Sequence, residues 1–255
     1  MDKIKIRISS FVLLILENDA QRFGFVKSDD SPNKNKLLNK LIPELLKIRK
    51  FRRERIRYLL ADMGKERTEE IYQAVNQVID EVYFTNEEIL VLDEQIWVLP
   101  TKQAETVFTE IYESELSITA LTITEYVRGL LNEYSLLPQY KREEFVFHHE
   151  IKMIQHACAL GKILHFEFEG EKYKFFPFQH MYGFLYDQTN YLIGYDMIRK
   201  QIRSFPIRAL SRLFMLKSTF SPCKDLIMKL QNYLNEYDYG EDNIESLGAN
   251  YEDQE

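Results

Sequence analysis

The sequence predicts an α+β protein, with a strand and two helices at the N-terminus, a helical middle, and a small β-barrel followed by a helix. Strict alternation of charged and apolar residues over 3–8 indicates the strand, and helical spacing of apolar residues recurs up to residue 134. Short alternating segments between residues 163 and 216 favour a small barrel. We divide the chain into residues 1–60, 61–149, 150–220, 221–238 and an acidic tail, 239–255.

The first strand has one basic and one apolar face. Lys3, Lys5 and Arg7 alternate with three isoleucines, so the cations point outward when the isoleucines are buried. A lone terminal strand is unstable, and it requires either a second copy of the chain or an internal mate. An ordinary edge strand protected by lysines is the alternative interpretation.

Two helices follow this strand. Ser9 and Ser10 can cap a helix over residues 11–23. Ser31 as cap and Pro32 at the first helical position predict the start of a second, leucine-rich helix.

The second helix leads into the densest basic segment of the chain, residues 47–57, with seven cations and one carboxylate. On a helix, Arg52 and Arg55 fall inside the apolar arc, which favours contact with a polyanion. The alternative is a structural helix that pairs with the acidic segment after residue 60. The candidate nucleic-acid-binding residues of the N-terminal region are Lys3, Lys5, Arg7, Arg49, Lys50, Arg52, Arg53 and Arg55.

The strand-helix-helix order recurs about ninety residues further along the chain. Residues 96–99 form a short apolar strand, and helical patterns follow over 104–112 and 126–134. We interpret this segment as a degenerate second copy whose strand is a candidate internal mate for the first. The second strand carries no basic face.

The net charge of −7 hides strong local differences. Residues 1–60 hold fifteen basic and seven acidic residues, whereas residues 61–95 hold two and ten. The last twenty residues hold eight acidic residues and no basic one, which is typical of a solvated tail, with mimicry of a nucleic-acid backbone as the alternative. A nucleic-acid site must therefore be a local stripe.

Residues 1–46 resemble the ribbon-helix-helix family. In that family two strands, one from each protomer, pair and place alternate side chains in a nucleic-acid groove. The resemblance implies a homodimer and directs the first strand's cations toward nucleic acid.

Residues 150–220 resemble the WYL domain, an Sm/SH3-like small β-barrel of prokaryotic regulators and defence-associated proteins. The resemblance rests on the motif strand Tyr191–Tyr195, on Pro177 upstream, and on the arginine-bearing strand Arg203–Leu210. Together with a preceding ribbon-helix-helix unit, this architecture is similar to accessory proteins of type VI-D CRISPR-Cas systems. The resemblance implies binding of single-stranded RNA and stimulation of an RNA-targeting effector.

The chain departs from the WYL pattern at three positions. Asn190 stands where the family has its tryptophan, and Pro206 and Ala209 stand where two arginines are usual. Arg203 is retained, and shifted positions supply Arg208 and Arg212.

The strands of this predicted barrel mix cations with aromatic residues. Unpaired bases stack on exposed rings while cations contact phosphates, so the composition suits a single strand better than a duplex. The alternative is that many of these rings are simply buried. The candidate binding residues are His165, Lys172, Lys174, Tyr191, Arg199, Arg203, Arg208 and Arg212.

Other function classes find little support in the sequence. No glycine-rich phosphate loop or nucleophile motif occurs, so we expect no enzyme activity and no cofactor. His148, His149, Glu150 and His156 lack the spacing of a zinc site, and Cys158 and Cys223 lie too far apart for a CxxC. Residues 11–16 are too short an apolar stretch for a membrane span, and we expect a cytoplasmic protein.

These observations predict a non-enzymatic, homodimeric nucleic-acid-binding regulator. Single-stranded RNA and a CRISPR effector protein are the expected partners. Two alternatives remain open: a transcriptional regulator that binds a DNA operator and senses a ligand or nucleotide through its WYL domain, and an adaptor whose charges contact only a protein.

Overall fold

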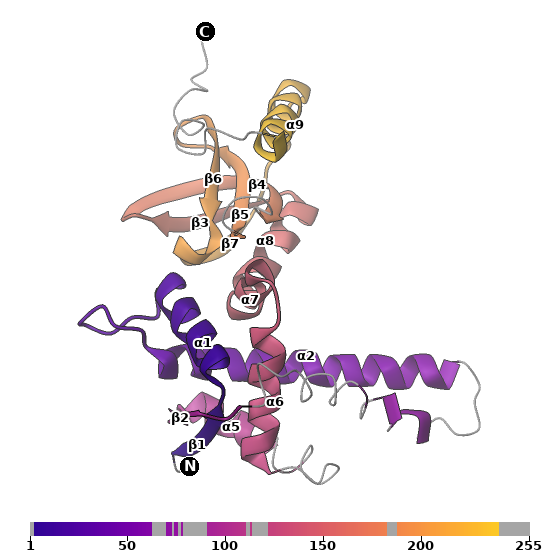
Figure 1. Cartoon of the computed structure of the whole chain (residues 1–255). Coiled ribbons are helices and arrows are strands. Elements are labelled where there is room, and N and C mark those ends of the chain that lie inside the picture. The colour runs from indigo at the N-terminus through magenta and orange to yellow at the C-terminus, as the bar shows by residue number, and fades with distance from the viewer. Residues whose placement is uncertain are drawn as a thin grey trace. The chain divides into compact units, whose positions relative to one another are not determined.

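The computed structural model divides the chain into an N-terminal unit, Met1–Leu137, and a C-terminal unit, Pro138–Glu255 (Figure 1). The structure describes residues 3–62, 70–72, 74–75, 78, 91–110, 113, 122–182 and 188–239. In the N-terminal unit these residues form β1 (Ile4–Ile8), α1 (Ser10–Arg22), α2 (Lys34–Asp62), β2 (Glu94–Val98), α5 (Lys102–Glu110) and α6 (Ile123–Ser135).

The strands β1 and β2 pair antiparallel and form a two-stranded ribbon within one chain. The three isoleucines of β1 are buried, as are Ile96 and Val98 of β2, so the apolar sides of both strands face the same core. Lys5 and Arg7 are exposed on the opposite face. The predicted alternation is confirmed, and the internal mate proposed for the first strand is present.

The helix α1 begins where the serine residues predict it. Ser9 is the N-cap, and its hydroxyl accepts a hydrogen bond from the Val12 amide at 3.2 Å. At the other end of the helix, the buried carboxylate of Asp19 accepts a hydrogen bond of 2.7 Å from the hydroxyl of Tyr134 on α6. This hydrogen bond joins α1 to α6 within the N-terminal unit.

The predicted start of the second helix at Ser31 and Pro32 is wrong. Ser31 donates from its backbone and hydroxyl to Asp29, and Pro32 forms an isolated bridge with Val26. Asn33 instead accepts from the Lys36 amide at 3.1 Å, which caps α2. The local turn competes successfully for the Ser31 side chain, because a serine can satisfy a turn as well as a helix end.

The C-terminal unit contains a five-stranded antiparallel sheet and three α-helices among its described residues. The helices α7 (Gln139–Val146) and α8 (His148–Leu160) precede the sheet, and α9 (Lys224–Tyr239) follows it. The strands lie in the order β6-β5-β4-β3-β7. Their bounds are β3 (Lys162–Phe168), β4 (Glu171–Tyr182), β5 (Asn190–Asp196), β6 (Gln201–Pro206) and β7 (Ser211–Thr219).

The predicted closed barrel is not found in the described part of the sheet, where β6 and β7 each pair with one neighbour and not with each other. The strand β6 ends at Pro206, which has no amide hydrogen to donate, and residues Ile207–Ala209 turn into a 3₁₀ helix. The sheet is therefore open. Most of the predicted strand over 182–186 lies outside the described residues.

A small apolar core joins α9 to the sheet. Leu230 and Tyr233 of α9 are buried against Ile193 of β5 and Ile202 of β6. Gly194, next to this core, allows close packing, since a Cβ atom there would lie 2.1 Å from the Phe176 carbonyl oxygen. No described helix is long and apolar enough to cross a membrane.

Candidate nucleic-acid interface

The exposed face of the β1–β2 ribbon carries a row of cations. Lys3, Lys5 and Arg7 occupy alternate positions and are all exposed. None of the three forms an ion pair with a carboxylate among the residues that the structure describes. Within the described part of the chain their charges are therefore not neutralised by carboxylates, an arrangement suited to an external anion.

The tryptophan of the chain lies in the middle of this cationic face. Trp97 is directly opposite Lys5 in the ribbon register, and 44% of its surface is exposed. The Nζ atoms of Lys3 and Lys5 lie 4.6 and 5.7 Å from its ring centroid. These distances are those of cation–π contacts.

The cation–π contacts of Trp97 are weaker than the stacking of a nucleic-acid base on the same ring. An exposed cation–π contact contributes about 0.5–1 kcal/mol. Stacking of a nucleic-acid base on an aromatic side chain contributes about 1–3 kcal/mol. A base can therefore replace a lysine on the Trp97 ring and leave its ammonium group for a phosphate.

The free edge of β1 is covered by α6. The Arg128 side chain donates from Nε to the Arg7 carbonyl oxygen at 2.9 Å, and the Thr124 hydroxyl donates to the Lys5 carbonyl oxygen at 3.5 Å. A strand edge covered in this way is protected from pairing with another chain.

The start of α6 is held by a capping box. Thr122 accepts from the Glu125 amide, and the Glu125 carboxylate accepts from the Thr122 amide at 2.8 Å. The hydrogen bonds from the Thr122 backbone and hydroxyl lower the pKa of Glu125. The cap thus fixes the first turn of the helix that covers β1.

The basic segment of α2 is engaged within the N-terminal unit. The Arg49 side chain is buried, with its guanidinium 4.9 Å from the centroid of the Tyr126 ring. Arg52 forms an ion pair of 2.6 Å with the buried Glu133 of α6. These two candidate residues pack α2 against α6.

The three other candidates on α2 lie nearer to solvent. Lys50 and Arg55 are exposed, Arg53 is half-buried, and the Arg55 guanidinium lies 5.4 Å from the ring centroid of its neighbour Tyr58. Most of the acidic segment proposed as a partner for this helix lies outside the described residues.

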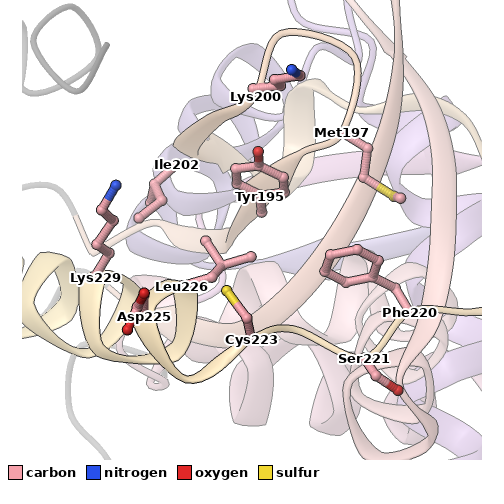
Figure 2. A pocket seen from close by; sticks show the side chains of 10 residues that line it. All are labelled: Tyr195, Met197, Lys200, Ile202, Phe220, Ser221, Cys223, Asp225, Leu226 and Lys229. Carbon is pink, nitrogen blue, oxygen red and sulfur yellow. The ribbon is translucent and has the colours of Figure 1, made fainter. Parts of the chain in front are cut away.

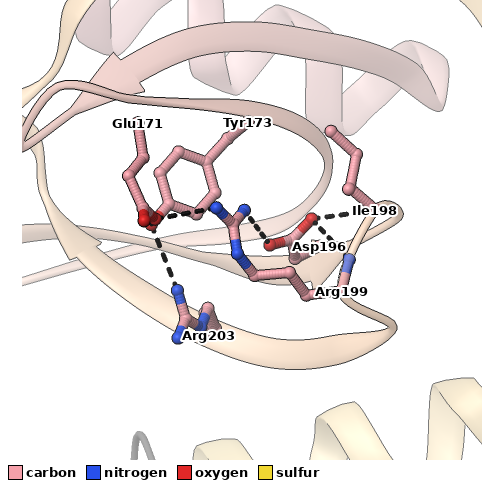
Figure 3. A network of polar contacts seen from close by, with 6 residues as sticks. All are labelled: Glu171, Tyr173, Asp196, Ile198, Arg199 and Arg203. Atoms are coloured by element: carbon pink, nitrogen blue, oxygen red, sulfur yellow. Dashed lines mark hydrogen bonds and ion pairs between the residues drawn. The ribbon is translucent and has the colours of Figure 1, made fainter.

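Arg199 of the C-terminal unit lies between two carboxylates (Figure 3). It contacts Asp196 at 3.0 Å and Glu171 at 2.7 Å, and its guanidinium lies 4.5 Å from the Tyr173 ring centroid. The hydrogen bond to Asp196 raises the pKa of Arg199, while burial raises that of the Tyr173 hydroxyl. The Arg199 charge is therefore neutralised within the unit.

Asp196 organises the turn that follows β5. Its fully buried carboxylate accepts from the Ile198 amide at 2.9 Å and from the Arg199 amide at 3.2 Å. Arg203 lies on the adjacent strand and donates to the Tyr173 hydroxyl at 3.1 Å. This network connects β4, β5 and β6.

Arg208 and Arg212 are also held by partners within the C-terminal unit. Arg208 donates to the Thr189 hydroxyl and lies 3.9 Å from the buried carboxylate of Glu143. Arg212 is largely exposed and forms an ion pair of 2.9 Å with Glu167. The candidate arginines on β6 and after it therefore have structural contacts.

Asn190 stands at the position where the WYL pattern has a tryptophan. Its backbone amide donates to Glu143 at 2.7 Å, and its side-chain amide donates to the same carboxylate and to the Tyr140 carbonyl, both at 2.9 Å. Its Oδ1 lies 3.0 Å from Nε2 of His180. The asparagine thus links β5 to α7 and β4.

A second row of side chains, exposed at Lys174 and Phe214 and half-buried at His165, crosses β4, β3 and β7. His165 lies between Lys174 and Phe214 in the sheet register, and its ring stacks on the Phe214 ring at a centroid distance of 5.0 Å. Lys172 and Lys174 are exposed, whereas Tyr191 is half-buried against the apolar core beneath α9. Of the sheet candidates, the structure brings only His165 and Lys174 together with an exposed aromatic ring in this row.

Sequence analysis missed Trp97 and Phe214 as surface aromatics. The alternation of buried and exposed residues in β2 was available from the sequence, and pairing Ile6 with Ile96 places Trp97 on the basic face. No comparable signal identified Phe214, because β7 lacks regular alternation in burial.

A cavity of 570 Å³ lies beside the first turn of α9 (Figure 2). Its apolar walls include Tyr195, Phe220 and Leu226, and Lys200 and Lys229 add charge.

The chemistry of the cysteine and histidine side chains gives no further site in the described part of the chain. Burial raises the pKa of the Cys158 thiol to about 12. Among the residues described, no group of histidine, cysteine and carboxylate side chains is suited to hold a metal ion.

Comparisons with known proteins give a fold relationship. No protein-family model matches the chain, and no curated protein matches it in sequence. A solved structure described as a CRISPR Cas-related protein superposes with a TM-score of 0.64 at 13% identity. The match covers 95% of this chain and 73% of that protein, so the two share a fold across both units.

Proposed function

We propose that this protein is a non-enzymatic regulator that binds single-stranded RNA and stimulates an RNA-targeting CRISPR-Cas effector. The observation that carries the proposal is the row of Lys3, Lys5 and Arg7, which is exposed and has no carboxylate partner among the described residues. Consecutive cations on one strand face match the repeated charge of a phosphate backbone.

The fold supports the class of protein. The pairing of β1 with β2 within one chain provides the two-stranded ribbon that the ribbon-helix-helix family builds from two protomers. The Tyr191–Tyr195 motif lies on β5, and Arg203 lies on the adjacent β6, which supports assignment of the C-terminal unit as a WYL domain. The similarity to a CRISPR Cas-related protein supports a role in the same kind of system.

RNA binding is tested by fluorescence anisotropy with labelled single-stranded RNA, single-stranded DNA and a random duplex across a range of salt. We expect the tightest binding to single-stranded RNA. Three phosphate contacts predict a slope of log affinity against log salt of about −2. Duplex binding as tight as RNA binding would contradict the proposal.

Effector stimulation requires a separate assay. Target-RNA cleavage by a type VI-D effector is measured with and without this protein, and then with a Lys3→Gln, Lys5→Gln, Arg7→Gln variant. We expect the wild-type chain to raise the cleavage rate and the variant to lose most of this effect. Equal stimulation by both proteins would show that stimulation of the effector does not depend on the three ribbon cations.

A DNA-binding transcriptional regulator is the second candidate. The ribbon geometry favours it, because two-stranded ribbons fit the major groove of DNA. In this alternative, the cavity beside α9 would bind the regulatory ligand or nucleotide. Tight, sequence-dependent duplex binding identifies this function.

The homodimer stays a prediction. The internal pairing of β1 with β2 removes the need for a second chain at the ribbon, so a dimer would use another surface. Light scattering coupled to size exclusion measures the mass directly.

A further inference from the structure

We propose that Trp97 is the platform on which an unpaired RNA base stacks, and that it makes the ribbon selective for single strands. This inference rests on the proposed function and names the specificity residue of the same site. Lys3 and Lys5, whose ammonium groups lie 4.6 and 5.7 Å from the ring centroid, would bind the phosphates on either side of that base.

The position of Trp97 indicates a role outside the protein core. Its neighbours Ile96 and Val98 are 4% and 0% exposed, and they supply the inward side of β2. The Trp97 side chain occupies the outward side and remains 44% exposed. A large ring on a cationic face, where core packing does not require it, is suited to bind a flat ligand with negative charges.

The geometry favours an unpaired base over a duplex. In a duplex the faces of the bases are covered by their neighbours, and only their edges reach the grooves. A single strand exposes base faces, on which aromatic side chains stack. The neighbouring lysines are flexible enough to leave the ring and follow the phosphates.

The sequence itself supplies the probe, because the chain contains one tryptophan. We would titrate the full-length protein with unlabelled oligouridine and oligoadenosine RNA of about 15 nucleotides, within the usual site size for single strands. Stacking should quench the Trp97 fluorescence, with the same midpoint as anisotropy measured on labelled RNA. A duplex at the same nucleotide concentration should leave the fluorescence nearly unchanged.

Three variants separate the ring from the charge. Trp97→Leu should weaken RNA binding about thirtyfold, the middle of the range for loss of one stacked base. The salt slope should stay the same, because no phosphate contact is removed. Trp97→Phe should recover most of the affinity, and Leu99→Ala, which changes an exposed apolar residue two positions away, should bind like the wild type.

Each contrary result has a definite meaning. If Trp97→Leu binds RNA as tightly as the wild type in anisotropy, Trp97 is not the platform, while the proposed function stands. Equal quenching by duplex and single strand would also overturn the stacking role. If the wild-type chain binds no RNA in anisotropy, the proposed function fails and this inference fails with it. Circular dichroism of each variant verifies that the fold is retained, and Trp97→Phe provides the test if Trp97→Leu is unfolded.

Discussion

The ribbon of the N-terminal unit and the sheet of the C-terminal unit use cations in different ways. Lys3, Lys5 and Arg7 lie in a row with an exposed ring and no described carboxylate partner. Arg199 and Arg212 each contact a carboxylate within their own unit. Cations therefore lie exposed beside an aromatic ring in one region and are paired with carboxylates in the other, and their described neighbours distinguish the two.

The difference follows from burial. Asp196 is fully buried, and a buried carboxylate without a cation or hydrogen-bond donors is strongly destabilising. The Arg199 side chain supplies the cation that pairs with Asp196 inside the unit. Among the described residues, no buried carboxylate forms an ion pair with the ribbon lysines.

The largest expected effect is on the stability of the C-terminal unit. Gly194→Ala would place a Cβ atom 2.1 Å from the Phe176 carbonyl oxygen and 2.6 Å from a ring carbon of Phe175. We expect a loss of at least about 3 kcal/mol in the free energy of unfolding of this unit, since backbone cannot move aside cheaply. Urea unfolding followed by circular dichroism measures this loss. If RNA binding persists under conditions in which the C-terminal unit of the variant is unfolded, binding does not require that unit.

The next effect is on affinity. The Lys3→Gln, Lys5→Gln, Arg7→Gln variant should bind single-stranded RNA at least tenfold more weakly and with a salt slope reduced by about 2. The matched control, Lys172→Gln with Lys174→Gln, removes exposed cations from the sheet and should change affinity less than about threefold. Anisotropy across salt measures both. A larger loss of affinity in the control would indicate that RNA binds to the sheet of the C-terminal unit.

Arg199→Gln tests whether Arg199 contributes to the stability of the C-terminal unit and not to RNA binding. Removing the guanidinium leaves the buried Asp196 with backbone donors alone, and we expect a loss of about 1–3 kcal/mol in stability. RNA affinity should stay the same within about twofold. Thermal unfolding and anisotropy on one preparation give both values, and a loss of affinity without a loss of stability would make Arg199 a ligand-binding residue.

The smallest effect concerns the capping box that supports the ribbon. The pKa of Glu125 is lowered from 4.5, so its stabilising contribution is fully present above pH 4.5 and is lost as the pH falls through the folded value. Glu125→Gln should cost about 0.5 kcal/mol at pH 7 and nothing at a pH below the folded pKa. Unfolding curves of variant and wild type against pH measure the difference, and a constant difference would contradict the linkage.

The local elements of the ribbon could be predicted from the sequence, and its cations could be as well. Alternation in residues 3–8 determines which side of β1 is buried, and the apolar faces of both strands set the register. The partners of the sheet arginines could not be predicted in this way. Arg212 and Glu167 are 45 residues apart, and Arg199 and Glu171 are 28 apart, so only the sheet topology brings them together.

The expectation of a closed barrel failed for a related reason. Short alternating strands are equally compatible with a barrel and with an open sheet, and closure depends on whether the two edge strands meet. Pro206 ends β6 at the edge. Its effect on pairing becomes clear only when the strand order is known.

The joining of β1 and β2 in one polypeptide has a consequence for binding at low abundance. A ribbon assembled from two protomers exists only above the dissociation constant of the dimer. Here both strands belong to the same chain, so the ribbon persists at any dilution. Because the strands are encoded separately, substitutions can change the basic strand without altering the one that carries Trp97, and the ribbon can present two unlike halves to a ligand that has no twofold symmetry.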